Sequence, residues 1–376
     1  MWVLMVVMVM LVEMPMAWGQ LVRPPQTEPP RAVVVHDTVI SWDRSSMPGD
    51  IELMARKTLL AYDYLDYGKS YGRLFVTCGA AQYPELGRCP TEDTNQAGVG
   101  PSTVGVRLTE TRTGMATEIS VYGQLLRADG TIRCSTEFWK ANPNLLHTSY
   151  ATICSLDPPA GTSMHLWLPQ AELDRLVAGR WKGTLELNLR SPIEDGLGTY
   201  RFNFDFTITD HNAVSIYFPA FPNVSPLVAL NAGYDPISRT IGGRTGLDMC
   251  LYDGLGSQAQ YLGVTVRDTG TRPPGPSGFS LWHDTAGNDD SQRLDYTVTL
   301  DHNGTTVPLT NGVEEQLHGI DTAQLRLVML PGMSQPVFCV PTPMTLDIPR
   351  VPISTKRSGI YWGDLKVELR VPTATP

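Results

Sequence analysis

The sequence predicts an all-β protein made of two β-sandwich domains in tandem, and three observations lead to that prediction. Apolar residues alternate with polar ones along many segments, which is the period of half-buried antiparallel strands. Turn residues, among them 34 glycines and 30 prolines, separate these segments, as is typical of sandwiches. The chain has 376 residues, which at roughly 150 residues per domain is enough for two or three domains.

Residues 1–19 are predicted to be a signal peptide. Met1–Val12 is an almost purely apolar run, which is too short for a membrane-spanning helix. Ala17-Trp18-Gly19 then forms a small-x-small cleavage site, so the mature chain is expected to begin near Gln20. The alternative is a buried N-terminal helix. The rest of the sequence has no apolar run long enough to predict a membrane span.

The six cysteines of an exported chain predict disulfides. Six cysteines allow fifteen pairings, but four of them precede residue 155 and two follow residue 249, so each half can close its own bridges. Nearest-neighbour pairing gives two short loops, worth about 3 kcal/mol each, and a long one, worth about 4 kcal/mol. The three predicted bridges are Cys78–Cys89, Cys134–Cys154 and Cys250–Cys339.

The clearest strand patterns are Thr184–Arg190, Phe202–Ile208 and Asp364–Val371, where apolar and polar residues alternate strictly. This alternation places the apolar side chains on one face of each strand. Shorter candidate strands are Leu74–Cys78, Val104–Leu108, Glu118–Tyr122, Met164–Leu168, Leu247–Tyr252, Gly263–Val266, Tyr296–Leu300 and Leu325–Leu330.

Helix is expected in only two places. Ile51–Tyr64 predicts a helix, because Asp50 is a suitable N-cap and apolar residues such as Leu53 and Leu60 share one stripe. Gln170–Leu176 predicts one further helical turn.

A domain boundary is predicted at the polar step Thr209–Asn212. Strand patterns lie on both sides of it, Phe202–Ile208 before and Val214–Phe218 after, and the Asp-His-Asn sequence disfavours strand. This boundary also leaves an even number of cysteines on each side, and it gives domains of residues 20–210 and 211–376. The alternative is one continuous, bent strand.

The mature chain is predicted to start with a proline-rich leader, Gln20–Arg31. Pro24, Pro25, Pro29 and Pro30 each lack a backbone donor, so this segment cannot form a central strand of a sheet.

Motifs of catalysis are absent from the sequence, and the protein is predicted not to be an enzyme. It has no G-x-S-x-G elbow, no H-E-x-x-H and no P-loop. Acidic pairs such as Asp289-Asp290 and Glu314-Glu315 lie in polar loops, and His165 lies in an apolar run. A secreted β-sandwich hydrolase stays open as an alternative, because a glycosidase can bring together carboxylates distant in sequence.

Charge and ligand patterns exclude further classes. Lysine and arginine total 29 and aspartate and glutamate 38, so the net charge is 29 − 38 = −9, which argues against a nucleic-acid partner. The histidines are scattered singly and no C-x₂-C pair occurs, so neither a metal site nor a cofactor is expected.

Short motifs in a common order run along nearly the whole mature chain. They are Tyr71-Gly72-Arg73-Leu74-Phe75 leading to Cys78; Cys89-Pro90; Leu168-Pro169 with Glu172-Leu173 and Trp181; Leu187-Asn188-Leu189-Arg190; Gly198-Thr199-Tyr200 running to Thr209-Asp210; Phe218-Pro219; Asp248-Met249-Cys250-Leu251-Tyr252-Asp253-Gly254; and Gly359-Ile360-Tyr361-Trp362-Gly363-Asp364. With these motifs the sequence resembles the tip adhesins of class 5 (alternate chaperone–usher) fimbriae, the family of the colonisation factor antigen I minor adhesin and the cable-pilus initiator.

The resemblance implies two immunoglobulin-like sandwiches, an N-terminal adhesin domain and a C-terminal pilin domain. The pilin domain of this family lacks its last strand and is completed first by a periplasmic pilus chaperone and then, at the outer-membrane usher, by the N-terminal strand of the major pilin subunit. The proline-rich leader is a poor donor strand, so a chain that accepts a strand and donates none is expected at the fimbrium tip. The expected location is the cell surface, reached through the periplasm.

The resemblance also implies a receptor-binding surface of arginines that attaches to a host surface glycan or glycoprotein. Arg73 matches one arginine of the family's cluster, and Arg190 lies next to the place of two others, where this chain reads Ser191-Pro192. The alternative function is a structural pilus initiator or cap with little receptor binding, which the smaller cluster favours.

Overall fold

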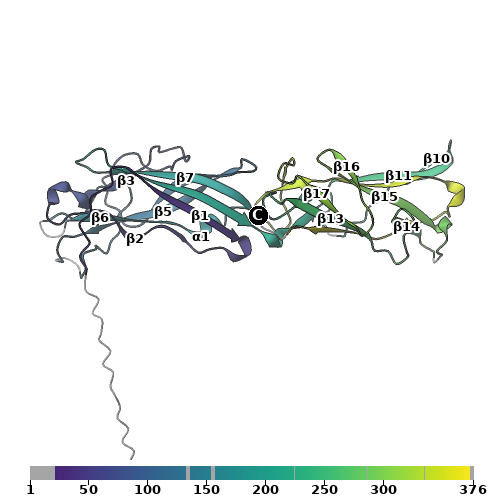
Figure 1. The fold of residues 1–376 in the computed structure, drawn as a ribbon, viewed down its shortest axis with the longest axis horizontal. Coiled ribbons are helices and arrows are strands. Elements are labelled where there is room, and N and C mark those ends of the chain that lie inside the picture. The colour runs from purple at the N-terminus through teal and green to yellow at the C-terminus, as the bar shows by residue number, and fades with distance from the viewer. Residues whose placement is uncertain are drawn as a thin grey trace, which may run out of the picture.

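The computed structural model describes residues 22–132, 136–153, 157–223, 225–285, 287–333 and 335–372. It shows an elongated molecule of two β domains that lie end to end (Figure 1), which confirms the predicted all-β, two-domain fold class. The predicted signal peptide, residues 1–19, and the predicted bridge Cys134–Cys154 lie outside the described residues.

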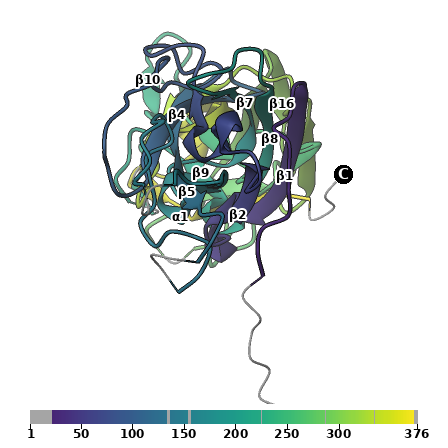
Figure 2. The same cartoon turned by 90° about the vertical axis from the view of Figure 1, so that its left-hand side faces the viewer.

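The N-terminal domain is one curved sheet of eight strands in the order β1-β8-β7-β4-β5-β6-β2, with β3 paired to β7. Seen end-on, its strands surround a common interior (Figure 2). Its elements are β1 (Val33–Asp43), η1 (Arg44–Ser46), β2 (Ile51–Tyr62), η2 (Tyr67–Lys69), η3 (Tyr71–Arg73), β3 (Phe75–Thr77), β4 (Ser102–Glu110), β5 (Ala116–Ala128), β6 (Gly161–Leu168), α1 (Gln170–Leu173), β7 (Gly179–Arg190) and β8 (Thr199–Thr209).

β7 and β8 show how the predicted alternation builds the core. Leu185, Leu187 and Leu189 are buried on β7, and Phe202 and Phe206 are buried on β8. Leu185 pairs with Phe202 in the ladder between the two strands. Burial of each such side chain contributes about 1.5–3 kcal/mol, so these two strands form the centre of the domain.

The helix predicted over Ile51–Tyr64 is wrong, because this segment forms strand β2, which pairs with β6. The register between the two strands shifts at three places, and Lys57 has a positive φ of 68°. Each bulge inserts an extra residue and breaks the alternation, so the apolar residues of a bulged strand fall at spacings that resemble those of a helix. The short helix predicted from Gln170 is confirmed as α1, which ends at Leu173.

β1 is a strand that the alternation pattern did not lead us to predict. It pairs in parallel with β8 along its whole length, from Val33 opposite Thr199 to Asp43 opposite Thr209. Its outward valines, such as Val39, are exposed. The leader before it forms a single bridge, from Thr27 to Tyr62, within the part of the chain that the structure describes.

The C-terminal domain contains three sheets, in the orders β10-β11-β20-β15-β14-β21, β18-β19-β12-β9 and β17-β13-β22, with β16 paired to β15. Its elements are η4 (His211–Ala213), β9 (Ser215–Tyr217), β10 (Gly233–Asp235), β11 (Thr240–Leu247), β12 (Cys250–Tyr252), β13 (Tyr261–Asp268), β14 (Phe279–His283), η5 (Asp290–Gln292), β15 (Arg293–His302), β16 (Thr305–Pro308), β17 (Glu314–His318), β18 (Arg326–Val328), β19 (Val337–Pro341), β20 (Met344–Pro352), η6 (Ile353–Thr355), β21 (Tyr361–Trp362) and β22 (Leu365–Arg370).

Two of the predicted disulfides are present among the described residues. Cys78–Cys89 closes a short loop beside β3 and has a Cα–Cα distance of 5.3 Å. Cys250–Cys339 joins β12 to β19 with a Cα–Cα distance of 5.7 Å. Both distances are ordinary for disulfides.

The two domains share a packed junction. Tyr252 and Val337 of the C-terminal domain are buried in the same apolar cluster as the N-terminal core. The Arg112 guanidinium donates a hydrogen bond to the Ala323 carbonyl at 2.6 Å, and Asp210 N donates to the Gly254 carbonyl at 2.7 Å. These contacts join one end of the C-terminal domain to the N-terminal domain.

Candidate functional site

β22 is an edge strand of the C-terminal domain. It pairs antiparallel with β13, from Leu365 opposite Asp268 to Arg370 opposite Gly263. Within the described residues no strand pairs with its other side. The outer backbone groups of β22 are therefore available to another strand.

The apolar side chains of β22 lack cover on one side. Val367 and Leu369 pack against the domain core but stay half-buried. Their ladder partners on β13, Val266 and Val264, have no exposed surface. Opposite residues of a ladder lie on the same face of a sheet. The core therefore covers Val264 and Val266 completely but covers Val367 and Leu369 only in part.

Residues 225–232 form a second uncovered border of the same core. Pro226, Val228 and Leu230 are half-buried, whereas Ser225, Leu227 and Ala229 between them are exposed. This alternation is that of a strand, yet no ladder includes the segment. Among the described residues it is held by the Thr245 hydroxyl, which donates to the Ala229 carbonyl at 2.7 Å. We call β22 and residues 225–232 together the open edge.

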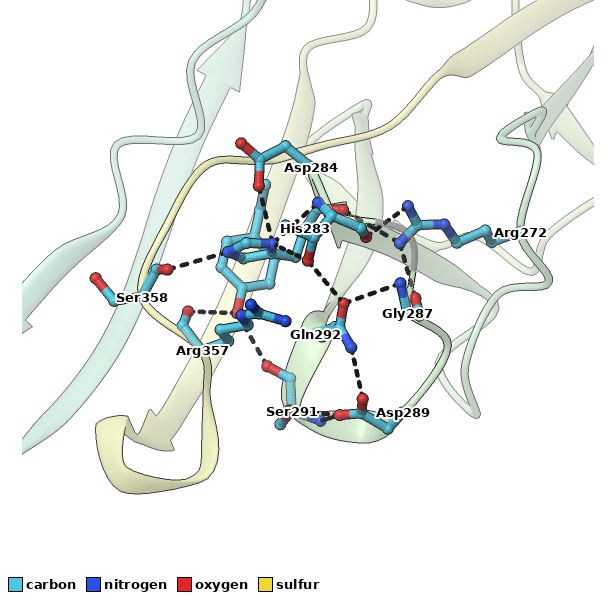
Figure 3. A network of polar contacts seen from close by, with 11 residues as sticks. Arg272, His283, Asp284, Gly287, Asp289, Ser291, Gln292, Arg357 and Ser358 are labelled. Carbon is cyan, nitrogen blue, oxygen red and sulfur yellow. Dashed lines mark hydrogen bonds and ion pairs between the residues drawn. The ribbon is translucent and has the colours of Figure 1, made fainter.

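A polar network fixes the chain just before β22 (Figure 3). The buried His283 has its Nε2 3.0 Å from the Ser358 carbonyl and its Nδ1 2.9 Å from the Thr285 hydroxyl. Gly359 passes over the ring so closely that a Cβ there would lie 2.0 Å from His283 Nε2. The chain that leads into β22 is therefore anchored at a glycine.

Gln292 and Arg272 complete this network on the side of β14 (Figure 3). Gln292 Oε1 accepts from the Thr285 hydroxyl at 3.0 Å and from Gly287 N at 3.1 Å. The Arg272 guanidinium donates to the carbonyls of His283, Thr285 and Gly287. These bonds tie the chain that leads through β21 to β22 to the end of β14 and the loop that follows β14.

Arg73 and Arg190, the arginines predicted to bind a receptor, lie at the same end of the N-terminal domain. β3 pairs with the end of β7 so that Phe75 is opposite Arg190, and Arg73 ends the turn η3 just before β3. Arg73 Nε lies 3.5 Å from the Ser149 carbonyl and Arg190 Nε 3.5 Å from the Thr77 hydroxyl.

Neither of these two arginines has a carboxylate partner among the described residues. Other arginines of the same sheet are ion-paired, such as Arg180 with Asp205 at 2.7 Å. Because β7 starts at the domain junction and runs away from it to Arg190, the pair lies at the far end of the molecule. We call Arg73 and Arg190 the arginine surface.

Arg127 is a fully buried arginine behind this surface, and the sequence reasoning missed it. Its guanidinium donates to the carbonyls of Leu74, Thr148 and Tyr150 and to the Thr162 hydroxyl, at 2.6–3.1 Å. Burial, with a smaller contribution from the nearby Arg73 cation, lowers the pKa of Arg127 to about 9. A charged residue in the apolar stretch of β5 was the available signal.

Asp93 contacts the same stretch of backbone as Arg127, at Ser149. It accepts hydrogen bonds from Ser149 N at 2.9 Å and from Asn95 N at 2.8 Å. Burial alone would raise the pKa of Asp93, but the hydrogen bonds from Ser149 and Asn95 outweigh it and lower that pKa. The Ser149 backbone is thus held between Asp93 and Arg73.

The described residues offer neither a metal site nor a membrane helix. No group of three or more histidine, cysteine, aspartate or glutamate residues among them is arranged to hold a metal ion. None of their helices has the length and apolar character needed to cross a bilayer.

Comparisons with known proteins follow the two-domain division. Residues 22–211 match the family model for the first domain of CfaE, a subunit of CFA/I fimbriae, and residues 214–373 match the model for its second domain. The CFA/I fimbrial protein CfaE of Escherichia coli is 27% identical over 312 residues, which cover 79% of this chain and 80% of that protein.

Solved structures show the same fold. The chain is similar to the crystal structure of CfaE, the adhesive subunit of CFA/I fimbria of enterotoxigenic Escherichia coli, with 24% identity, a TM-score of 0.70 and coverage of 94% of this chain and 95% of that one. It is also similar to a chain of a chaperone–tip adhesin complex of CFA/I fimbriae biogenesis, with 24% identity, a TM-score of 0.68 and coverage of 93% and 99%.

The fold, the open edge and these matches define the class of the protein as a fimbrial adhesin subunit, located in the fimbria outside the cell. More specifically, the chain belongs to the CfaE family of CFA/I fimbrial subunits. Its relatives are fimbrial adhesin subunits and not enzymes.

Proposed function

We propose that the protein is the tip adhesin that initiates fimbrial assembly by accepting a donor strand from the major pilin. The open edge carries this proposal. A strand placed along β22 would pair with its free backbone groups and cover the half-buried side chains of β22 and residues 225–232. In strand addition, main-chain hydrogen bonds give affinity and pockets for alternate side chains give specificity.

The other end of the chain supports a position at the tip. The first strand of the described residues, β1, is already used in the N-terminal sheet, where it pairs with β8. The leader before it is rich in proline, and each proline lacks the backbone N–H that a complementing strand would donate. A subunit that accepts a strand and donates none can only end the polymer.

The proposed partners act in sequence on the open edge. A periplasmic pilus chaperone fills it first, and the relative solved in a chaperone–tip adhesin complex supports this step. At the outer-membrane usher, the N-terminal strand of the major pilin then replaces the chaperone. In this proposal residues 1–19 direct export, residues 20–210 are the adhesin domain and residues 211–376 are the pilin domain.

The proposed receptor surface is the arginine surface, Arg73 and Arg190, acting on a host surface glycan or glycoprotein. Its support is its place at the far end of the molecule and two guanidinium groups without carboxylate partners among the described residues. A guanidinium group without a carboxylate partner can form strong charge-assisted hydrogen bonds with a ligand. The second candidate function, an initiator or cap with little receptor binding, is favoured by Ser191-Pro192 following Arg190.

A thermal unfolding experiment tests strand acceptance. The mature chain is heated alone, with a synthetic peptide of the N-terminal strand of its cognate major pilin, and with a scrambled peptide of the same composition. The pilin peptide should raise the Tm and the scrambled peptide should not, because only the native order places apolar residues at alternate positions. Equal Tm values in all three samples would reject the proposal.

A further inference from the structure

The proline-rich leader is attached to the N-terminal domain at several points. Thr27 N donates to the Tyr62 carbonyl at 2.9 Å, and Tyr62 N donates to the Thr27 carbonyl at 2.8 Å. Pro29, which follows shortly after, is buried. Proline rings fix the backbone angle φ, so the pair Pro29-Pro30 is a stiff piece of chain. The leader therefore combines a stiff backbone with fixed contacts to the domain.

One anchor of the leader is Glu28, which holds the segment that leads to Arg73. Glu28 Oε1 accepts a hydrogen bond from the Lys69 ammonium at 2.7 Å, and Glu28 Oε2 accepts one from the Tyr71 hydroxyl. Tyr71 is 5% exposed, and its carbonyl accepts from the Thr162 hydroxyl at 2.7 Å. Burial, followed by the hydrogen bond to Glu28, raises the pKa of Tyr71 to about 12. Glu28 thus contacts the turn η3 that ends at Arg73.

The other anchor holds the loop that follows β7. The Arg31 guanidinium forms an ion pair with the Glu194 carboxylate at 2.6 Å. Gly198 N donates to the Pro30 carbonyl at 2.7 Å, and the Gly198 carbonyl accepts from Leu189 N at 3.0 Å. Because β7 ends with the second arginine of the arginine surface, this anchor fixes the chain that leaves that arginine.

Residues 28–31 therefore connect the two segments that carry the arginine surface, and we call them the brace. The two anchors, Glu28 and Arg31, are separated by two prolines. The arginines of the surface lie at the border of the β3–β7 ladder, because Arg190 pairs with the first residue of β3 and Arg73 precedes that strand. Their guanidinium groups make contacts of 3.5 Å, so the backbone decides where these groups lie.

We propose that the brace positions Arg73 and Arg190 relative to each other for receptor binding, with Glu28 and Arg31 as its positioning residues. This inference rests on the proposed receptor surface. Two guanidinium groups bind one ligand well when their spacing is set before the ligand arrives, because less conformational entropy is then lost on binding. The prolines of the leader supply the stiffness that such a brace needs.

The test measures three properties of charge-reversal variants of the full mature chain. They are the attachment of protein-coated beads to an epithelial cell layer that wild-type beads bind, hydrogen exchange of the Gly198 amide, and the Tm. The variants are Arg31→Glu, Glu194→Arg and the double variant that carries both. Arg107→Glu is the matched control, because Arg107 forms an exposed ion pair with Glu85 at 2.8 Å in the same domain.

We expect each single reversal to weaken attachment by about threefold to tenfold and to speed exchange of the Gly198 amide, because like charges replace the ion pair. The Tm should change by a few degrees at most. The double variant restores the pair with its charges exchanged and should recover both attachment and exchange. Arg31→Lys and the control should attach as the wild type does. Glu28→Ala releases the other anchor and should weaken attachment to a similar extent.

Three outcomes overturn the inference, and they are distinguishable. If the single reversals and Glu28→Ala attach as the wild type does, the brace has no role in binding. If Arg31→Glu weakens attachment, Glu194→Arg does not and the double variant stays weak, Arg31 contacts the receptor itself and does not position other residues. If Arg73→Ala attaches as the wild type does, the proposed receptor surface fails and the inference fails with it, whatever the exchange of the Gly198 amide.

Discussion

Arg127 is the residue on which the organisation of the arginine surface depends most. Its guanidinium joins Leu74, just before β3, to the backbone of Thr148 and Tyr150. A buried cation that has only neutral acceptors is costly to desolvate. Its four hydrogen bonds offset that cost by satisfying oxygens that would otherwise be buried without donors.

We predict that Arg127→Met destabilises the protein by about 2–4 kcal/mol, because it leaves buried acceptors without donors. The measurement is equilibrium urea unfolding. Arg201→Met is the matched control, since Arg201 is half-exposed and paired with Glu186, and its loss should cost about 1 kcal/mol or less. Equal effects of the two substitutions would contradict this role of Arg127.

Arg73→Ala should weaken attachment to host cells by about tenfold or more while the Tm stays unchanged. A charge-assisted hydrogen bond to a ligand contributes about 1.5–3 kcal/mol, whereas the contact of Arg73 with Ser149 is long, at 3.5 Å. Arg88→Ala, which removes an arginine paired with Glu118 in the same domain, serves as the control in the adhesion assay. Attachment equal to that of the wild type would remove Arg73 from the receptor surface.

Asp43 gives the molecule an acid-sensitive link at the domain junction. Its carboxylate accepts from Ser45 N at 2.9 Å, from the Thr209 hydroxyl at 2.8 Å and from His211 N at 3.1 Å. Burial would raise the pKa of Asp43, but these hydrogen bonds are stronger and hold its pKa well below the ordinary value. The folded chain therefore releases this proton more readily than the unfolded chain.

Because the folded pKa is the lower one, the stabilisation by Asp43 is complete above the unfolded pKa of about 3.9 and is lost as the pH falls through the folded value. We predict that Asp43→Asn lowers the free energy of unfolding at pH 7 by about 1–2 kcal/mol and flattens its decline below about pH 5. Unfolding curves from pH 7 to pH 2 measure both. Parallel pH profiles for the two proteins would contradict the prediction.

At the scale of the element, the loop of residues 353–360, which leads into β21, depends on Gly359. A Cβ at this residue would collide with His283 Nε2, so Gly359→Ala should displace the loop and destabilise the protein by about 2–4 kcal/mol. Gly304→Ala is the control, because Gly304 also has a positive φ, of 76°, but faces open space; it should cost about 1 kcal/mol. Urea unfolding of both variants, with equal losses of stability, would refute the steric role of Gly359.

The strands that were predictable from sequence are those that alternate without interruption. β7, β8 and β22 keep a strict period of two, and the structure has them at the predicted positions. β2 was not predictable, because three register shifts against β6 break its period. β1 was missed because it is a parallel border strand with exposed valines, stabilised by β8, which lies far along the sequence.

At the scale of the whole molecule, the even number of cysteines on each side of the boundary agrees with bridges that stay within one domain, Cys78–Cys89 and Cys250–Cys339. The open edge could not be derived from alternation, because β22 has the pattern of any half-buried strand. Whether a neighbour covers such a strand depends on the complete topology, and only the resemblance to a fimbrial family predicted a missing strand. Arg127 was missed for a related reason, since the loops that bury it are distant in sequence.

The central claim, that the open edge accepts a strand of another subunit, is tested most directly by hydrogen exchange of the β22 amides. The mature chain is compared with and without the N-terminal strand peptide of its cognate major pilin. The ladder of β7 and β8, which lies inside the sheet between β1 and β4, is the internal reference. We predict that the peptide slows exchange in Leu365–Arg370 by at least about tenfold, because outer amides that face water become hydrogen-bonded, and leaves β7 and β8 unchanged. Exchange in β22 that is the same with and without the peptide would contradict the account.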